Sequence, residues 1–123
     1  MLKGIGLDIV DVSRIKKAAE KWEKSFLQKV FTQAELSYCL GKKASYQSLA
    51  ARFAAKEAAV KALGIGFQGV TWQDIEVTND ALGKPALILK GKALEIAEDQ
   101  GVREMHLTLS HCKEYAVAQV IFL

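Results

Sequence analysis

The sequence predicts an α+β fold in which a largely antiparallel sheet packs against one central helix. Residues 52–63 have the alanine-rich pattern of a helix that Gly64 would end, and residues 2–10 alternate as a strand does. Residues 116–122 form a second, strongly apolar strand pattern. Helices and strands are grouped along the chain rather than strictly alternating, which favours antiparallel pairing over a parallel βαβ sheet.

The length of 123 residues and the composition indicate one globular domain over residues 1–123. The chain is 50% hydrophobic and 25% charged, which argues against disorder, and its net charge of +3 is too small to indicate a nucleic-acid partner. Cys39 and Cys112 lack metal-like spacing, so we expect reduced thiols. No signal-peptide or membrane-span pattern is present, and we therefore expect a cytoplasmic protein with no membrane partner.

Within the central helix, Phe53, Glu57 and Lys61 follow at intervals of four and therefore share one face. Alanines on the neighbouring faces would let this helix lie close to a sheet, with a carboxylate and an amine at the packing seam. The alternative is an ordinary surface ion pair between Glu57 and Lys61, which stabilises a helix by about 0.2–0.5 kcal/mol.

A second carboxylate, Asp8, lies within the first predicted strand. Alternation places Ile5, Leu7 and Ile9 on one face. The other face would carry Gly4, Gly6, Asp8 and Val10. Aspartate is disfavoured inside strands, so Asp8 either ends the strand in solvent or holds a positive group, and the two glycines leave space beside the backbone.

The next segment predicts a helix with one basic face. Asp11 or Ser13 can cap it, and its apolar stripe is Ile15, Ala19, Trp22 and Phe26. The opposite side carries Arg14, Lys17, Lys21 and Lys24. Such a face is either simply solvated or the docking surface for an acidic protein.

The remaining elements are shorter. We expect a helix within residues 31–47 that begins at a Thr32 cap with Glu35 in the capping-box position. Strands are expected at 72–78 and 86–90, a helix at 91–100 with Leu94, Ile96 and Ala97 inward, and a hairpin of strands 105–111 and 115–123. The last strand is so apolar that a helix or another subunit should cover each face, with Val117 and Val120 as candidate subunit contacts.

Two loops suit anions without being specific for them. Lys42 and Lys43 lie in a basic loop that suits either a phosphate or plain solubility. Residues 64–69 have the letters of a dinucleotide-binding fingerprint, but they follow a helix and lead into a strand, which is the wrong context for that site. This glycine loop can still present backbone N–H groups to an anion.

Three separated patches resemble the holo-[acyl-carrier-protein] synthase family, the short bacterial type of 4′-phosphopantetheinyl transferase. These patches are Gly4–Val10, Arg52–Ala58 together with Lys61, and Leu109–His111. The Gly83–Pro85 loop and the chain length also fit, so the resemblance spans essentially the whole chain.

The resemblance implies transfer of the phosphopantetheine arm of coenzyme A to a serine of acyl carrier protein, with release of 3′,5′-ADP, in support of fatty acid biosynthesis. It implies that Asp8 and Glu57 bind Mg²⁺ and that Lys61 contacts the reacting phosphate. The residues it suggests for coenzyme A are Lys42, Lys43, Arg52, Lys61, Gly64, Gly66, Lys84, Pro85, Ser110 and His111. The basic helix, with Arg14, Lys17, Lys21 and Lys24, would receive the acidic carrier protein. The family pattern also implies a homotrimer with active sites at subunit boundaries.

The residue chemistry agrees with this function. Breaking a pyrophosphate linkage requires positioning and neutralisation of phosphate charge, which Mg²⁺ on one or two carboxylates and a lysine supply. The proton of the attacking serine would pass to a metal-bound water or to Glu57. His111 is either a satisfied histidine at a strand end or part of a nucleotide pocket with Ser110. Two other classes of protein also fit: a non-enzymatic module that binds nucleotides or acidic proteins, and a structural oligomer built on the last strand.

Overall fold

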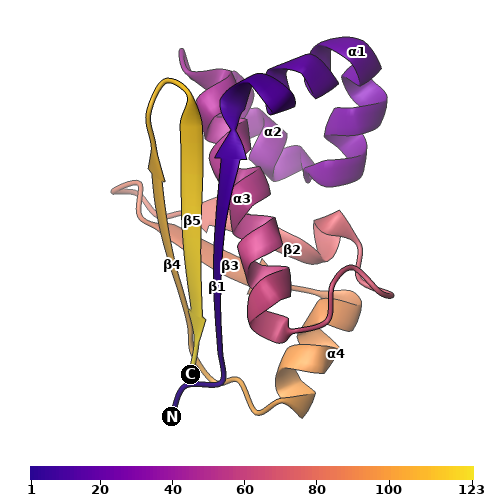
Figure 1. Cartoon of the computed structure of the whole chain (residues 1–123), viewed down its shortest axis with the longest axis vertical. Helices are drawn as coiled ribbons and strands as arrows, with labels where there is room; N and C mark the ends of the chain where they lie inside the picture. Colours follow the sequence, from indigo (N-terminus) through magenta and orange to yellow (C-terminus); the bar gives the residue numbers. More distant parts are fainter.

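The computed structural model describes all residues, 1–123, and confirms the α+β class (Figure 1). The helices are α1 (Val12–Val30), α2 (Gln33–Leu40), α3 (Ser45–Leu63) and α4 (Gly91–Asp99). The strands are β1 (Gly4–Asp11), β2 (Ile75–Asn79), β3 (Pro85–Leu89), β4 (Met105–His111) and β5 (Tyr115–Phe122). No helix has the length and apolar character needed to span a membrane.

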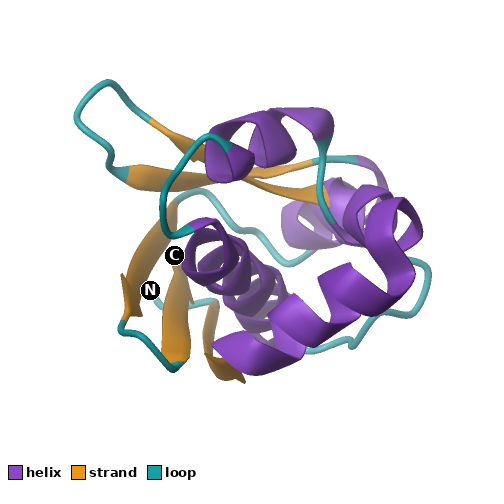
Figure 2. Ribbon diagram, turned by 90° about the horizontal axis from the view of Figure 1, so that it is seen from above, coloured by secondary structure: helices purple, strands orange, loops and turns teal.

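The strands form two antiparallel sheets around the central helix α3. One sheet has the order β1-β5-β4, so that the first strand pairs with the last and β1 and β4 are its edges. The other sheet consists of the hairpin β2-β3. Seen from above, strands lie on different sides of the helix that runs through the middle of the molecule (Figure 2). This arrangement explains why α3 is buried along most of its length, with even Arg52 and Lys56 enclosed.

The helix α3 packs directly on the backbone of β1. A Cβ atom added at Gly6 would lie 1.8 Å from the carbonyl oxygen of Ala58, and one added at Gly4 would lie 2.1 Å from that of Ala62. The predicted space beside these glycines therefore exists, and the backbone of α3 fills it. The predicted helix end is also confirmed, since Gly64 adopts the left-handed conformation (φ 75°) and its N–H donates to the carbonyls of Val60 and Lys61.

The predicted alternation of β1 is confirmed, and it divides the three-stranded sheet into a covered and an open face. Gly6 and Val10 face α3, whereas Ile5, Leu7 and Ile9 are 54%, 58% and 66% exposed. On β5, Ile121 pairs with Ile5 and Val117 pairs with Ile9, and both β5 side chains are only half-buried. We call these five side chains the open apolar face. Within one chain, therefore, only one face of the last strand is covered.

This division corrects one of the two candidate subunit contacts. Val120 is fully buried on the face of β5 that α3 covers, so it cannot meet another subunit. Val117, three positions earlier, lies on the open apolar face. The apolar pattern of the strand predicted burial correctly, but it did not distinguish the side that the chain covers by itself.

Three local predictions were wrong. Trp22 is 57% exposed rather than part of the inward stripe of α1, because the backbone kinks at Glu23, a non-glycine residue with φ 48°. Residues 72–74 form a 3₁₀ turn instead of the start of a strand, because the side chain of Asp74 accepts a hydrogen bond from the N–H of Thr71. Leu94 is 41% exposed, and Ala93 takes the inward position on α4.

Candidate functional site

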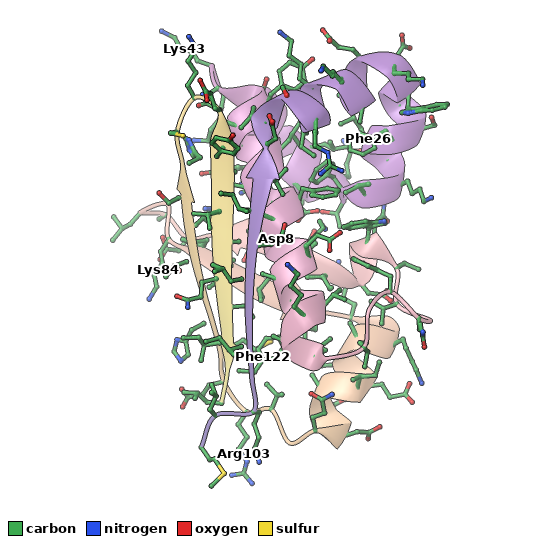
Figure 3. All side chains as sticks on the ribbon, in the orientation of Figure 1. Asp8, Phe26, Lys43, Lys84, Arg103 and Phe122 are labelled. Carbon is green, nitrogen blue, oxygen red and sulfur yellow. The ribbon has the colours of Figure 1, made fainter.

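Asp8 and Lys61 meet at the seam between β1 and α3. Asp8 points from the covered face of β1 towards the helix (Figure 3), and its side chain is 16% exposed. The Nζ atom of Lys61 lies 2.9 Å from Asp8 Oδ1 and also donates to the carbonyl oxygen of Leu7 at 3.0 Å. Of the two interpretations of Asp8, the structure therefore supports the one in which this carboxylate holds a positive group.

Glu57 completes this cluster without sharing the ion pair. It lies one helical turn before Lys61, but Lys61 pairs with Asp8 instead, so the ordinary surface pair between Glu57 and Lys61 is not formed. The carboxyl group of Glu57 is half-buried, and burial raises its pKa. The negative charge of Asp8 raises this pKa further, while the positive charges of Lys61 and Arg14 oppose the rise. Asp8 and Glu57 are thus close enough to repel one another, which is the situation that a bound cation relieves.

The residues of this cluster fit a divalent ion that takes most of its ligands from elsewhere. No group of three or more histidine, cysteine, aspartate or glutamate side chains gathers to form a complete metal site. Mg²⁺ commonly binds through one or two carboxylates and completes its shell with water and substrate phosphates. Asp8 and Glu57 match that donor set.

A basic cavity of about 610 Å³ lies at the other edge of the three-stranded sheet. It opens between the loop after α2, the first turns of α3, the β2-β3 hairpin loop and the edge strand β4. Its polar and charged lining residues are Tyr38, Lys42, Lys43, Ser48, Arg52, Asn79, Lys84, Thr108 and His111. No acidic side chain lines it, so the cavity suits an anionic ligand.

Arg52 is the buried cation of this cavity. It is 3% exposed, forms none of the ion pairs of the chain, and leaves its Nε atom without a hydrogen-bond partner. Its guanidinium group donates to Ser48 Oγ at 3.4 Å and to Asn79, and it stacks 4.3 Å from the ring centroid of Tyr38. Burial of a guanidinium group that has no paired carboxylate costs free energy unless an anion pairs with it. Arg52 therefore indicates that a phosphate or another anionic group binds at this wall of the cavity.

The carboxylate cluster and the basic cavity lie on opposite sides of the same chain. Arg52 and Lys61 are nine positions apart, so at 3.6 residues per turn they project from opposite sides of α3. Asp8 is on the edge strand β1, whereas Lys84 lies beyond the other edge strand, β4, and Lys43 lies past the end of the β4-β5 hairpin (Figure 3). The width of the three-stranded sheet therefore separates the two parts within a single chain.

Not every predicted coenzyme A residue lies at the cavity. Lys42, Lys43, Arg52, Lys84, Pro85 and His111 line it. Gly64, Gly66 and Ser110 do not line it, and the N–H of Gly64 already donates within the helix. The glycine loop instead packs Phe67 against Trp72, at 4.1 Å between ring centroids, and Trp72 stacks at 4.9 Å on Phe53 of the Phe53–Glu57–Lys61 stripe.

Sequence reasoning missed a buried ion pair between α3 and α2. Lys56 and Glu35 are both fully buried, with 2.8 Å between Nζ and Oε1. Lys56 also donates to the carbonyl oxygens of Trp72 and Ile75, and Glu35 accepts from the N–H groups of Thr32 and Val77. Burial lowers the pKa of Lys56. The available signal of an inward-facing lysine was the position of Lys56 one turn before Val60 and three residues before Ala59, on an apolar side of the helix.

The basic side chains of α1 remain exposed, as a docking surface requires. Arg14, Lys17, Lys21 and Lys24 are all exposed. The kink at Glu23 separates Lys24 from the first three, which share the straight N-terminal part of α1. Arg14 is also close enough to Glu57 to influence its pKa, so the predicted docking face borders the carboxylate cluster.

Comparison with known proteins agrees with these features. The family model described as the 4′-phosphopantetheinyl transferase superfamily matches residues 4–120. A holo-[acyl-carrier-protein] synthase of Halothermothrix orenii is 47% identical over 121 residues, which cover 98% of this chain and 97% of that protein.

Two solved structures have the same fold. The crystal structure of the Neisseria meningitidis holo-[acyl-carrier-protein] synthase has a TM-score of 0.90 and 37% identity, covering 100% of this chain and 99% of that one. The Bacillus anthracis synthase, solved in complex with CoA (3′,5′-ADP), has a TM-score of 0.81 and 39% identity, covering 99% and 96%. On this evidence the chain belongs to the 4′-phosphopantetheinyl transferase superfamily, within its holo-[acyl-carrier-protein] synthase family.

Proposed function

We propose that this chain, acting as one domain, transfers the 4′-phosphopantetheine arm of coenzyme A to a serine of apo acyl carrier protein, in a Mg²⁺-dependent reaction that supports fatty acid biosynthesis. The observation that carries the proposal is the cluster of Asp8, Glu57 and Lys61 at the seam between β1 and α3. Two carboxylates and one amine at the meeting of two elements are the groups that phosphoryl transfer requires. Family membership favours an enzyme over the two non-enzymatic classes considered from the sequence.

Each residue of the cluster has a distinct part in the reaction. Asp8 and Glu57 would hold Mg²⁺, which when bound neutralises charge on the phosphate oxygens. Lys61 contacts the phosphate that carries the pantetheine arm. The serine oxygen bonds to this phosphorus, the pyrophosphate bridge breaks, and 3′,5′-ADP departs with the electron pair of that bond. The serine proton would pass to the Glu57 carboxylate or to water at this cluster.

The basic cavity is the proposed site for the 3′,5′-ADP portion of coenzyme A. This portion carries phosphate groups, and the cavity offers Arg52, Lys42, Lys43 and Lys84 with no carboxylate to compete. The Bacillus anthracis relative, whose structure contains CoA (3′,5′-ADP), supports the assignment of this ligand.

The two halves of the site would come from different subunits of a homotrimer. The support is geometric: the carboxylate cluster borders β1, and the cavity lies beyond β4, across the full width of the sheet. The open apolar face, made of Ile5, Leu7, Ile9, Val117 and Ile121, gives a second subunit a surface to cover. A neighbouring cavity could then face this cluster, and the number three comes from the family resemblance.

The acidic carrier protein would dock on the basic face of α1. Arg14, Lys17 and Lys21 are exposed along the straight part of the helix, and Lys24 lies just past its kink. Because Arg14 borders the carboxylate cluster, a carrier on this face would have its serine near Glu57 and Lys61. Matched charge of this kind speeds encounter and sets register.

The test is mass spectrometry of apo acyl carrier protein after incubation with coenzyme A, Mg²⁺ and the protein. We expect the carrier to gain the mass of one phosphopantetheine group with wild-type protein and with the control Asp99→Asn, an exposed carboxylate of α4. Asp8→Asn keeps the shape of the side chain but removes its charge, so it should reduce the rate strongly without unfolding the protein. An unmodified carrier with the wild-type protein would refute the proposed function. A normal rate for Asp8→Asn at limiting Mg²⁺ would refute the metal assignment.

A further inference from the structure

Lys61 is bound to a carboxylate that the proposed function assigns to the metal. Its ammonium group lies 2.9 Å from Asp8 Oδ1 and 3.0 Å from the carbonyl oxygen of Leu7. It therefore fills a cation position on Asp8 in the protein alone. We propose that a divalent cation displaces Lys61 from Asp8 and that this exchange releases the ammonium group for the substrate phosphates. This inference rests on the proposed function, because it uses Asp8 as a metal ligand.

The two partners of the ion pair differ in their freedom to move. The Asp8 side chain is short, 16% exposed and fixed by a strand that packs against α3. The Lys61 side chain is 52% exposed and has a flexible four-carbon stem. Exposed pairs of this kind are weak, and the second contact, to a neutral carbonyl, is readily exchanged for water. The amine is therefore the partner that leaves.

The charges favour exchange over simultaneous binding. Asp8 and Glu57 together carry two negative charges, which the single positive charge of Lys61 compensates only in part. A divalent ion compensates both carboxylates and then repels the ammonium group, which would otherwise lie against the same oxygen. The anionic phosphates of the substrate are the nearest new partner for Lys61 in the proposed reaction.

This exchange makes metal and coenzyme A binding depend on one another. Metal binding frees Lys61 for the phosphates, and phosphates that attract Lys61 free Asp8 for the metal. Coupling of two binding events through one group is reciprocal, so each ligand strengthens the other by the same factor. Lys61 thus lowers the affinity of the site for the metal until substrate is present.

The first experiment measures Mn²⁺ binding to the protein without substrate by electron paramagnetic resonance. It compares the wild type with Lys61→Met and with the control Lys92→Met, which removes an exposed lysine that pairs at 3.4 Å with Glu95 on α4. Lys61→Met should tighten the Kd for Mn²⁺ by up to about fivefold, the factor that corresponds to the strongest exposed ion pairs. Lys92→Met should leave the Kd unchanged. Lys61 is half-exposed, so its replacement should not prevent folding.

An Mn²⁺ affinity of Lys61→Met that equals or falls below that of the wild type would overturn the inference. The variant Asp8→Asn separates a wrong exchange from a wrong metal site. If Asp8→Asn weakens Mn²⁺ binding while Lys61→Met does not tighten it, the metal site is correct and only the exchange is wrong. If Asp8→Asn leaves Mn²⁺ binding unchanged, the metal assignment fails and the inference fails with it. As a second measurement, the factor by which Mn²⁺ tightens coenzyme A binding should be smaller in Lys61→Met. An equal factor in both proteins would overturn the release of Lys61 to the phosphates.

Discussion

Replacement of Gly6 by alanine tests whether the contact between β1 and α3 positions the site. The new Cβ would lie 1.8 Å from the carbonyl oxygen of Ala58, whereas ordinary contact begins at about 3.4 Å. Neither backbone can rotate away as a side chain would, so the strand and the helix must separate locally. Overpacking of this kind destabilises a protein by about 1–3 kcal/mol, and occasionally by more. Asp8 is two residues from the forced separation and Glu57 is next to Ala58, so the distance between the two carboxylates should change as well.

The assay has two readouts, urea unfolding and the rate of carrier modification. We expect Gly6→Ala to lower the free energy of unfolding and to reduce kcat/KM by about 100-fold, the size of effect that a displacement of about 1 Å produces in an active site. Gly41→Ala is the matched control, because its Cβ would meet only the carbonyl oxygen of Ser37 at 3.6 Å and its φ of −80° suits alanine. A Gly6→Ala protein with the urea midpoint and kcat/KM of Gly41→Ala would refute the argument from close packing.

Two further substitutions probe the buried ion pair and the open apolar face. Lys56→Met leaves the buried carboxylate of Glu35 without its cation, so the free energy of unfolding in urea should fall by about 3–5 kcal/mol. Adding Glu35→Gln should restore part of this loss. An unchanged urea midpoint for Lys56→Met alone would contradict this role of the pair. Val117→Lys places a charge on the open apolar face without entering the core. Sedimentation should therefore show dissociation to monomers, and each monomer should keep the urea midpoint of a folded single chain. A Val117→Lys protein that sediments as the wild type does, or a wild-type protein that is fully active as a monomer, would contradict the subunit arrangement.

The sequence alone determined the features that depend on near neighbours in the chain. The capping box at Thr32 and Glu35, the helix end at Gly64 and the alternation of β1 all follow from local backbone chemistry, and the structure confirms each of them. Helical spacing also placed Glu57 and Lys61 on one face. The family resemblance added Asp8 as their partner, and the family itself is confirmed by the comparisons.

Only the tertiary structure decided how these features meet. Lys61 pairs with Asp8, 53 residues away, rather than with Glu57 one turn away, because β1 brings Asp8 to the same seam. Lys56 is buried because α3 is enclosed on several sides, although a lysine in a helix usually points to solvent. Periodicity specifies which residues share a face of a helix or strand. It does not specify what lies opposite that face, because the opposite surface comes from distant parts of the chain or from another subunit.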